Sequence, residues 1–223
     1  MCGRFTLANS GQLSLRFGLA DPAEAENVAP APRYNLAPGQ DVATVVERAG
    51  QRSLRAMRWG FAPAWLKEAK GPAPINARAE TLLERPLFRG ALAQHRCLIP
   101  ADGFYEWQAL PGRKTKQPIY ARLRDGALFA FAGLYTPAGA DRTATCVIIT
   151  TAPNELMAPV HNRMPAILDP NDEAAWLDPD LTEPHAVLGM LHPYQADRME
   201  AYPVASLVSS VRNEGSELIA RQG

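Results

Sequence analysis

The sequence predicts an α+β fold: a mostly antiparallel, curved and barrel-like β-sheet with short helices at its periphery. Two observations lead to this prediction. Short apolar runs rich in β-branched residues dominate the chain of 223 residues, and such runs are typical of strands. Segments with helical spacing are few and short. Many short strands need either a closed sheet or covered edges, so we expect the sheet to curve.

The strands are expected where apolar and β-branched residues cluster between turn residues. These segments are 41–47, 96–100, 104–107, 119–124, 127–135, 144–151 and 163–168. The clearest local pattern is Asp125-Gly126, which separates two runs of alternating character. Asp-Gly favours a type I′ turn, in which both central residues need positive φ, so we expect a hairpin at this point.

Three short helices are expected. One spans residues 10–17. A second opens with a capping box at residues 81–84, where Thr and Glu occupy the N-cap and N3 positions. A third follows an acidic N-cap segment at 169–172 and leads toward Trp176. The proline-rich segment 21–39 is expected to be an ordered connector.

Length and charge limit the possible partners. The length suits a single domain over residues 1–223, with a core of about residues 2–220. The 23 basic and 23 acidic side chains give zero formal net charge. This balance excludes a basic protein that coats nucleic acid over its whole surface. Any anion site must therefore be local and built from a few arginines.

The three cysteines are far apart and form no C-x-x-C pair. Neither a disulfide framework nor a metal site is therefore expected. Cys97 and Cys146 lie in apolar strands, which favours buried thiols. The chain has no pattern of a signal peptide and no apolar run that could span a membrane. We expect a cytoplasmic protein with free thiols.

Cys2 has a distinct chemistry because it follows the initiator Met. Removal of Met1 would give Cys2 a free α-amine beside its thiol. The amine of such an aminothiol can condense with an aldehyde to a Schiff base, and the thiol can close on it to a thiazolidine. Acyl transfer by the thiolate is a second possibility. An incidental cysteine at position two is the third.

Four further residues have functional and structural interpretations. Glu106 lies in an aromatic strand, where a partly buried carboxyl group can act as a general acid, although it could equally be a solvated strand residue. His161 follows a proline-bounded turn and could transfer protons or be structural. On a strand or an extended turn, Asn76 and Arg78 would point to the same side. Arg78 could bind a phosphate or pair with Glu80.

The aromatic, turn-rich segment 59–65 contains Trp59, Phe61 and Trp65. Aromatic side chains beside cations can stack on unpaired bases. Packing in the core is the alternative interpretation, and Lys67 and Lys70 could extend a basic rim.

Taken together and in order, six motifs resemble the SOS response-associated peptidase (SRAP) family of abasic-site processing proteins. They are MCGRF at 1–5, RYNLAPG at 33–39, RWGFAP at 58–63, INARAET at 75–81, RCLIP with GFYEW within 96–107, and HNRMP at 161–165. The resemblance runs to about residue 220, where VRNEG at 211–215 is similar to the family's last segment.

This resemblance implies the SRAP fold and a catalytic role for four residues. Members bind single-stranded DNA, including junctions with duplex, and trap abasic sites as covalent crosslinks in the DNA-damage (SOS) response. Cys2 would form the thiazolidine after removal of Met1, which could be autoproteolytic. Glu106 would be the acid–base group. His161 would stabilise the opened sugar and act in slow reversal, and Asn76 would position the sugar.

The resemblance also implies which residues bind DNA, and that the active protein needs no other component. Arg4, Arg78 and Arg163 would hold phosphates, while Pro38 and Trp65 would line the DNA groove. No cofactor, no metal and no membrane contact are implied, and we expect a monomer. Some relatives have two adjacent tryptophans where this chain has Trp65 followed by leucine, so stacking could be reduced.

Three other functions remain open at this point. The first is a cysteine-type peptidase or autopeptidase, with hydrolase activity and no role on DNA. The second is an N-terminal-nucleophile amidotransferase, which also begins with Cys-Gly but does not match the later motifs. The third is a non-catalytic single-strand binding module in which Cys2 is incidental.

Overall fold

The computed structural model describes residues 2–63, 71–140 and 142–222. In these ranges the strands form two sheets. The first has the order β12-β8-β7-β1-β2. Its strands are β12 Met199–Pro203, β8 Gln117–Leu123, β7 Gly103–Gln108, β1 Phe5–Leu7 and β2 Arg33–Leu36. All of its pairings are antiparallel.

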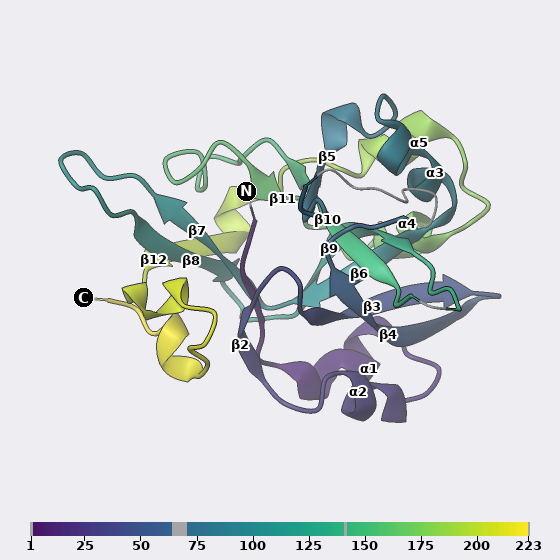
Figure 1. Ribbon diagram of the computed structural model, residues 1–223, viewed down its shortest axis with the longest axis horizontal. Helices are drawn as coiled ribbons and strands as arrows, with labels where there is room; N and C mark the ends of the chain where they lie inside the picture. Colours follow the sequence, from purple (N-terminus) through teal and green to yellow (C-terminus); the bar gives the residue numbers. More distant parts are fainter. Residues whose placement is uncertain (1, 64–70, 141, 223) are drawn as a thin grey trace.

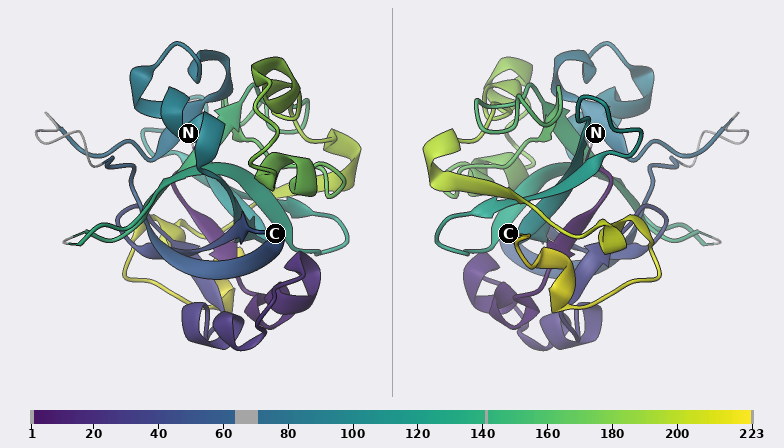
Figure 2. Two further views of the ribbon diagram at one scale, coloured as in Figure 1. Left: turned by 90° about the vertical axis from the view of Figure 1, so that its right-hand side faces the viewer. Right: turned by 90° about the vertical axis from the view of Figure 1, so that its left-hand side faces the viewer.

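The second sheet has the order β11-β10-β4-β3-β6-β9, with β5 added on β10. Its strands are β11 Met164–Pro165, β10 Thr145–Thr151, β4 Gln51–Trp59, β3 Asp41–Arg48, β6 Arg96–Ala101, β9 Phe129–Thr136 and β5 Asn76–Arg78. Strand β9, at one end of this order, also pairs with β10, the second strand from the other end. The result is a ring-like curved sheet that is not closed as a barrel, and its curvature is visible in Figure 2.

The helices are short and peripheral, as expected. They are α1 Leu13–Phe17, α2 Ala23–Val28, α3 Pro86–Gln94, α4 Glu173–Leu177 and α5 Pro184–Gly189. Helices α1 and α2 lie on one side of the curved sheet, and α3, α4 and α5 lie on the other (Figure 1). Within the described ranges, no helix has the length and apolar character needed to cross a membrane.

Phe5 of β1 joins the two sheets. Its ring packs edge-on against Trp59 of β4, with centroids 5.3 Å apart, and against Phe131 of β9 at 5.6 Å. All three side chains are buried. Burial of large aromatic side chains is the main source of stability in such a core. The chain immediately before Phe5 is therefore anchored at the contact between the sheets.

The α+β prediction is confirmed, and so are the expected strands at 41–47, 96–100, 104–107, 119–124, 127–135 and 144–151. The expected strand at 163–168 is reduced to β11, with one further bridge between Ile167 and Phe131. The helix at 10–17 is present as a 3-10 turn, Ser10–Gln12, followed by α1. Strands β1, β2, β4, β5 and β12 were not predicted.

The hairpin prediction at Asp125-Gly126 is wrong. A turn is present, because the Gly126 N–H donates to the Leu123 carbonyl at 3.1 Å. The flanking strands nevertheless belong to different sheets: β8 pairs with β7 and β12, and β9 pairs with β6 and β10. Strand β9 is buried along its whole length, so pairing in the centre of the curved sheet prevails over the local turn signal.

A hairpin with a two-residue loop is found instead between β3 and β4. Arg48 pairs with Gln51, and the two loop residues have positive φ, 51° at Ala49 and 73° at Gly50. This is the pattern of a type I′ turn. Alanine is unfavourable at positive φ, so the sequence carried no signal for it.

Two helix starts also differ from expectation. At the predicted capping box the chain forms a 3-10 turn, Ala79–Thr81, and the Thr81 hydroxyl donates to the Arg78 carbonyl at 3.5 Å. The following helix, α3, begins at Pro86. The helix leading to Trp176 starts at Glu173, after a turn in which Asp169 Oδ1 accepts from the Asn171 N–H.

Candidate active site

Cys2 is completely buried, at 0% exposure, and lies beside the strand that carries Glu106. The Tyr105 N–H donates to the Arg4 carbonyl at 3.0 Å, which continues the β1–β7 pairing toward the N-terminus. Burial and the neighbouring Glu106 carboxylate raise the pKa of the Cys2 thiol, and a hydrogen bond to the Arg4 backbone opposes this effect. The raised pKa therefore favours a protonated thiol within electrostatic range of the Glu106 carboxylate.

Glu106 is 2% exposed, which is unusual for a carboxylate, and it is in the middle of β7. On the neighbouring strand it pairs with Ile119. A carboxyl group removed from water in this way can exchange protons with a reacting group instead of with solvent. The solvated-strand interpretation of Glu106 is therefore wrong.

His161 lies in the loop between β10 and β11, next to the end of β7. Gln108 of β7 donates to the Pro159 carbonyl at 3.0 Å, which ties the loop to that strand. The Arg163 N–H donates to His161 Nδ1 at 3.0 Å. The same Nδ1 is 3.2 Å from the Arg163 carbonyl, so the tautomer of the imidazole decides whether Nδ1 accepts from the N–H or donates to the carbonyl.

Asn76 is the first residue of β5 and pairs with Ile148 of β10. Among the described residues, its side-chain Nδ2 and Oδ1 are buried and have no hydrogen-bond partner. A buried amide without partners costs about 1–3 kcal/mol. Such a group is retained more readily where a ligand completes its hydrogen bonds.

Arg78 and Arg163 flank Thr150 of β10 from two sides. Arg78 pairs with Thr150 in the β5–β10 register, and Arg163 Nη2 donates to Thr150 Oγ1 at 3.4 Å and also to its carbonyl. The Glu80 carboxylate accepts two hydrogen bonds from Arg163: Oε1 accepts from Nη1 at 2.7 Å, and Oε2 accepts from Nη2 at 2.9 Å. This pair lowers the pKa of Glu80. Arg78 is exposed, so the alternative of an Arg78–Glu80 pair is replaced by Arg163–Glu80.

Arg4 lies on a different side of the Cys2 segment. Its Nη1 donates to Asn35 Oδ1 at 3.0 Å and to the Val208 carbonyl at 2.7 Å. Its guanidinium also lies 5.9 Å from the centre of the Trp107 ring. Burial lowers the pKa of Arg4. Arg4 thus has structural partners, and its role toward phosphate stays a prediction.

The remaining predicted residues are less informative. Pro38 is exposed in the turn between β2 and β3. Trp65, Lys67 and Lys70 lie outside the described residues. Trp59 and Phe61 are core residues, at 1% exposure each, so the core-packing interpretation holds for these two aromatic side chains. Cys97 and Cys146 are buried free thiols, as expected.

The predicted site residues thus form two separate groups, each held by its own contacts. One contains Cys2 and Glu106, and the other contains Arg78, Arg163 and the loop of His161. The structure adds partners that the sequence did not indicate, namely Thr150, Asn35, Tyr105 and Trp107, which are distant in sequence from the residues that they contact. Glu80 pairs with Arg163 and not with Arg78, the partner that the sequence suggested.

The described residues offer no other obvious reaction centre. In the ranges that the structure covers, no three His, Cys, Asp or Glu side chains are grouped as metal ligands. A cavity of about 460 Å³ lies between β4 and the connection from β9 to β10. None of the predicted site residues lines it.

Comparison with known proteins identifies the family. The sequence profile described as SOS response associated peptidase (SRAP) matches residues 1–211. The chain belongs to the SRAP family. A relative from Bacillus subtilis, abasic site processing protein YoqW, is 47% identical over 224 residues, which cover 98% of this chain and 99% of the relative.

Other SRAP proteins are more distant but similar over most of their length. Abasic site processing protein YedK of Escherichia coli is 31% identical, over 98% of this chain and 99% of the relative. A solved structure from Bacteroides thetaiotaomicron has a TM-score of 0.85 and 24% identity, and covers 99% of this chain and 100% of that one. This last likeness bears on the SRAP fold alone.

Proposed function

We propose that this chain is an abasic-site processing protein that binds single-stranded DNA, including single-strand/duplex junctions, and forms a covalent crosslink with an abasic site through Cys2. One observation carries the proposal: the buried Cys2 thiol lies beside the buried Glu106 carboxylate, which raises the pKa of that thiol. The names of the SRAP relatives support the abasic-site role.

The proposed reaction begins with removal of Met1, by the chain itself or by another enzyme, which frees the α-amine of Cys2. The amine attacks the aldehyde carbon of the opened sugar, and loss of one water leaves a C=N bond. The thiol then adds to the carbon of this protonated C=N group: an S–C bond forms, the C=N bond becomes a single bond, and the thiol proton returns to the carboxylate that protonated the departing hydroxyl group. The product is a thiazolidine, and the overall reaction releases one water.

Glu106 would carry protons in both steps. It would donate a proton to the departing hydroxyl group and then accept the thiol proton as sulfur closes on carbon. Asn76 would form with the sugar the hydrogen bonds that its buried amide lacks, and His161 would stabilise the opened sugar and assist reversal. The exposed Arg78 would bind a phosphate directly.

A cysteine-type peptidase that acts on other proteins is a weaker proposal. A peptidase needs a thiolate nucleophile, and activated cysteines have a lowered pKa. Here burial and Glu106 raise the pKa of Cys2. The Schiff-base route begins from the amine and uses the thiol with its proton, so it fits this environment better.

The test is intact-mass analysis after mixing the protein, with loss of Met1 verified, with an oligonucleotide carrying one abasic site. We expect one adduct whose mass equals both reactants less one water. Cys2→Ala should give no adduct, and Cys97→Ala should react like the wild type because that thiol is buried in the core.

Absence of an adduct with the mature wild-type protein would overturn the proposal. Equal non-covalent DNA binding by the wild type and Cys2→Ala, with no adduct from either, would identify a binding module. Cleavage of a test peptide by the wild type alone, again with no adduct, would identify a peptidase.

A further inference from the structure

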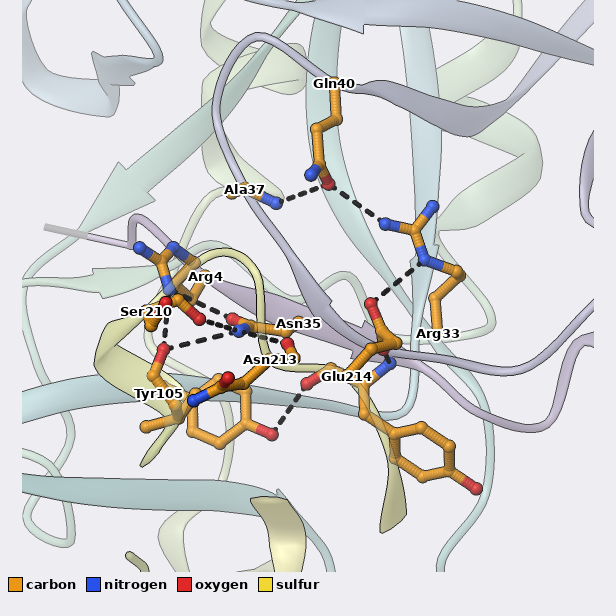
Figure 3. A network of polar contacts seen from close by, with 11 residues as sticks. Arg4, Arg33, Asn35, Ala37, Gln40, Tyr105, Ser210, Asn213 and Glu214 are labelled. Carbon is orange, nitrogen blue, oxygen red and sulfur yellow. Dashed lines mark hydrogen bonds and ion pairs between the residues drawn. The ribbon is translucent and has the colours of Figure 1, made fainter. Parts of the chain in front are cut away.

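Asn35 of β2 is a buried polar residue that links distant parts of the chain. Its exposure is 0%. Its Nδ2 donates to the carbonyls of Ser210 and Asn213, both at 2.9 Å, and its Oδ1 accepts from Arg4 Nη1 at 3.0 Å. Figure 3 shows these bonds converging on the one amide. A fully buried amide with every polar atom bonded fixes the geometry of its partners.

Arg4 connects this amide to the candidate nucleophile by three different groups. Its guanidinium binds Asn35 and the Val208 carbonyl. Its backbone carbonyl accepts from the Tyr105 N–H at 3.0 Å. Its backbone lies two residues from Cys2, and its interaction with the thiol partly opposes the raised pKa of Cys2. The position of Arg4 therefore determines where the sulfur lies relative to β7.

The two neighbours of Glu106 on β7 are held by the same region. The Tyr105 hydroxyl donates to the Tyr34 carbonyl at 2.8 Å, one residue before Asn35. Trp107 Nε1 donates to Ser209 Oγ at 3.3 Å. Because side chains alternate along a strand, these contacts hold the face of β7 opposite to Glu106.

We propose that Asn35 is a positioning residue for the Cys2 nucleophile: it fastens the C-terminal segment, residues 206–213, onto Arg4 and so holds Cys2 against Glu106. The inference rests on the proposed function for its effect on crosslinking. Asn35 would touch neither the DNA nor the reacting atoms. Its effect on the reaction passes through Arg4.

A second attachment of the same region provides a matched control. Glu214 accepts from Arg33 Nε at 3.3 Å and from the Tyr34 N–H. Both side chains of this ion pair are well exposed, at 37% and 40%, so the pair contributes little. Glu214→Gln keeps an acceptor oxygen for Tyr34 and leaves Arg4 and Asn35 unchanged.

The test compares Asn35→Asp, Arg4→Lys and Glu214→Gln with the wild type. Asn35→Asp replaces the donor by an oxygen that faces the two carbonyls. Arg4→Lys keeps the charge but loses the guanidinium, whose Nη1 donates to Asn35 and Val208 and whose Nη2 donates to the Ser209 carbonyl. Two rates are measured: crosslinking at saturating abasic DNA, and alkylation of each cysteine by iodoacetamide, resolved by peptide mass spectrometry.

For Asn35→Asp and Arg4→Lys we expect Cys2 to be alkylated about tenfold faster and to crosslink about tenfold more slowly, as for loss of a hydrogen bond that fixes geometry. Alkylation of the buried Cys97 and Cys146 should not change. Glu214→Gln should match the wild type in both rates. A more accessible thiol that reacts more slowly with the aldehyde is a result that accessibility alone does not produce.

Unchanged crosslinking and Cys2 alkylation in both Asn35→Asp and Arg4→Lys would overturn the inference while leaving the proposed function intact. Equal effects in Glu214→Gln would also overturn it. If Cys97 and Cys146 are alkylated faster in Asn35→Asp than in the wild type, that variant is unfolded. The rates of Arg4→Lys then decide whether the inference holds. If the wild type forms no crosslink, the proposed function fails, and the alkylation rates alone test whether Asn35 holds Cys2.

Discussion

Glu106 is a strand residue whose side chain is almost completely shielded from solvent. In the proposed reaction it transfers protons and does not bind DNA. Glu106→Gln keeps the shape of the side chain and removes the ionisable group. We expect the crosslinking rate to fall about a hundredfold, the lower range for loss of a general acid–base group, with DNA affinity unchanged.

Single-turnover crosslinking and fluorescence anisotropy measure the two quantities for Glu106→Gln separately. Equal losses in rate and in affinity would contradict the assignment and indicate a structural role.

Replacement of Asn76 separates a role in the reaction from a role in stability. Its amide is buried and lacks partners among the described residues, so Asn76→Ala removes no hydrogen bond. We expect crosslinking to slow about tenfold, while the free energy of unfolding does not fall, because the variant loses a buried amide that had no partners. Urea denaturation measures the stability.

Asn154 is the matched control for Asn76. Its amide is also buried, but Nδ2 donates to the Tyr194 carbonyl at 2.7 Å and Oδ1 accepts from the Met157 N–H at 3.0 Å. Asn154→Ala should therefore destabilise the protein by about 1–3 kcal/mol and leave crosslinking unchanged. The opposite ranking of the two variants would show that Asn76 is a structural residue.

At the level of elements, a small polar network fixes β1 on β7. Asp102 accepts from the Thr6 hydroxyl at 2.5 Å and from the Ala8 and Asn9 N–H groups at 2.6 and 2.7 Å. Tyr120 of β8 is 2.9 Å from the same Thr6 hydroxyl. Tyr120 reaches this position across Gly103, where a Cβ would lie 2.1 Å from its hydroxyl oxygen.

Gly103→Ala should therefore push Tyr120 away and disturb β1. Such overpacking costs about 1–3 kcal/mol, and we expect the melting temperature to fall. Gly90 of α3 is the control, since a Cβ there would meet nothing within 4 Å. Gly90→Ala should raise the free energy of unfolding by about 0.5–1 kcal/mol. Equal melting temperatures for the two variants would contradict this account.

Local composition predicted most strands correctly but not how they pair. The central strands β6, β9 and β10 are buried along their whole length, so apolar runs identified them. Short strands such as β1, β2 and β5 have three or four residues, which is too few to show an apolar run or an alternating pattern. The Asp125-Gly126 turn failed as a hairpin signal because strand pairing is decided by burial across the whole sheet.

At the level of the molecule, the site was predictable in its chemistry and not in its geometry. An aminothiol at Cys2 follows from residue types alone, and the motifs indicated Glu106, His161 and Asn76. The Arg163–Glu80 pair joins residues 83 positions apart. Contacts at such separations depend on the topology, which the sequence pattern did not determine.

The three buried thiols predict that stability decreases at alkaline pH. Burial raises the pKa of Cys146 from 9.0 to about 12, and it also raises the pKa of Cys2 and Cys97. Above pH 9 the unfolded thiols lose protons while the folded thiols keep them. The folded state then binds more protons than the unfolded state, so the free energy of unfolding falls as pH rises.

Urea denaturation from pH 8 to 11 measures this alkaline decrease. Cys146→Ala should make the free energy of unfolding fall less steeply with pH, whatever the stability of this variant at neutral pH. A slope equal to that of the wild type would contradict a raised pKa for Cys146.

The bond between Arg4 and the Val208 carbonyl spans 204 residues of sequence, and this separation has a consequence for biosynthesis. A ribosome adds about 5–20 residues per second, so roughly 10–40 s pass between synthesis of the two partners. During that interval the Arg4 guanidinium cannot acquire its Val208 partner, although β2 and β7, which pair with the first strand, are already made. The segment that carries Cys2 is thus among the earliest parts to be made, while the bond that ties its Arg4 to the C-terminal region can form only near the end of translation.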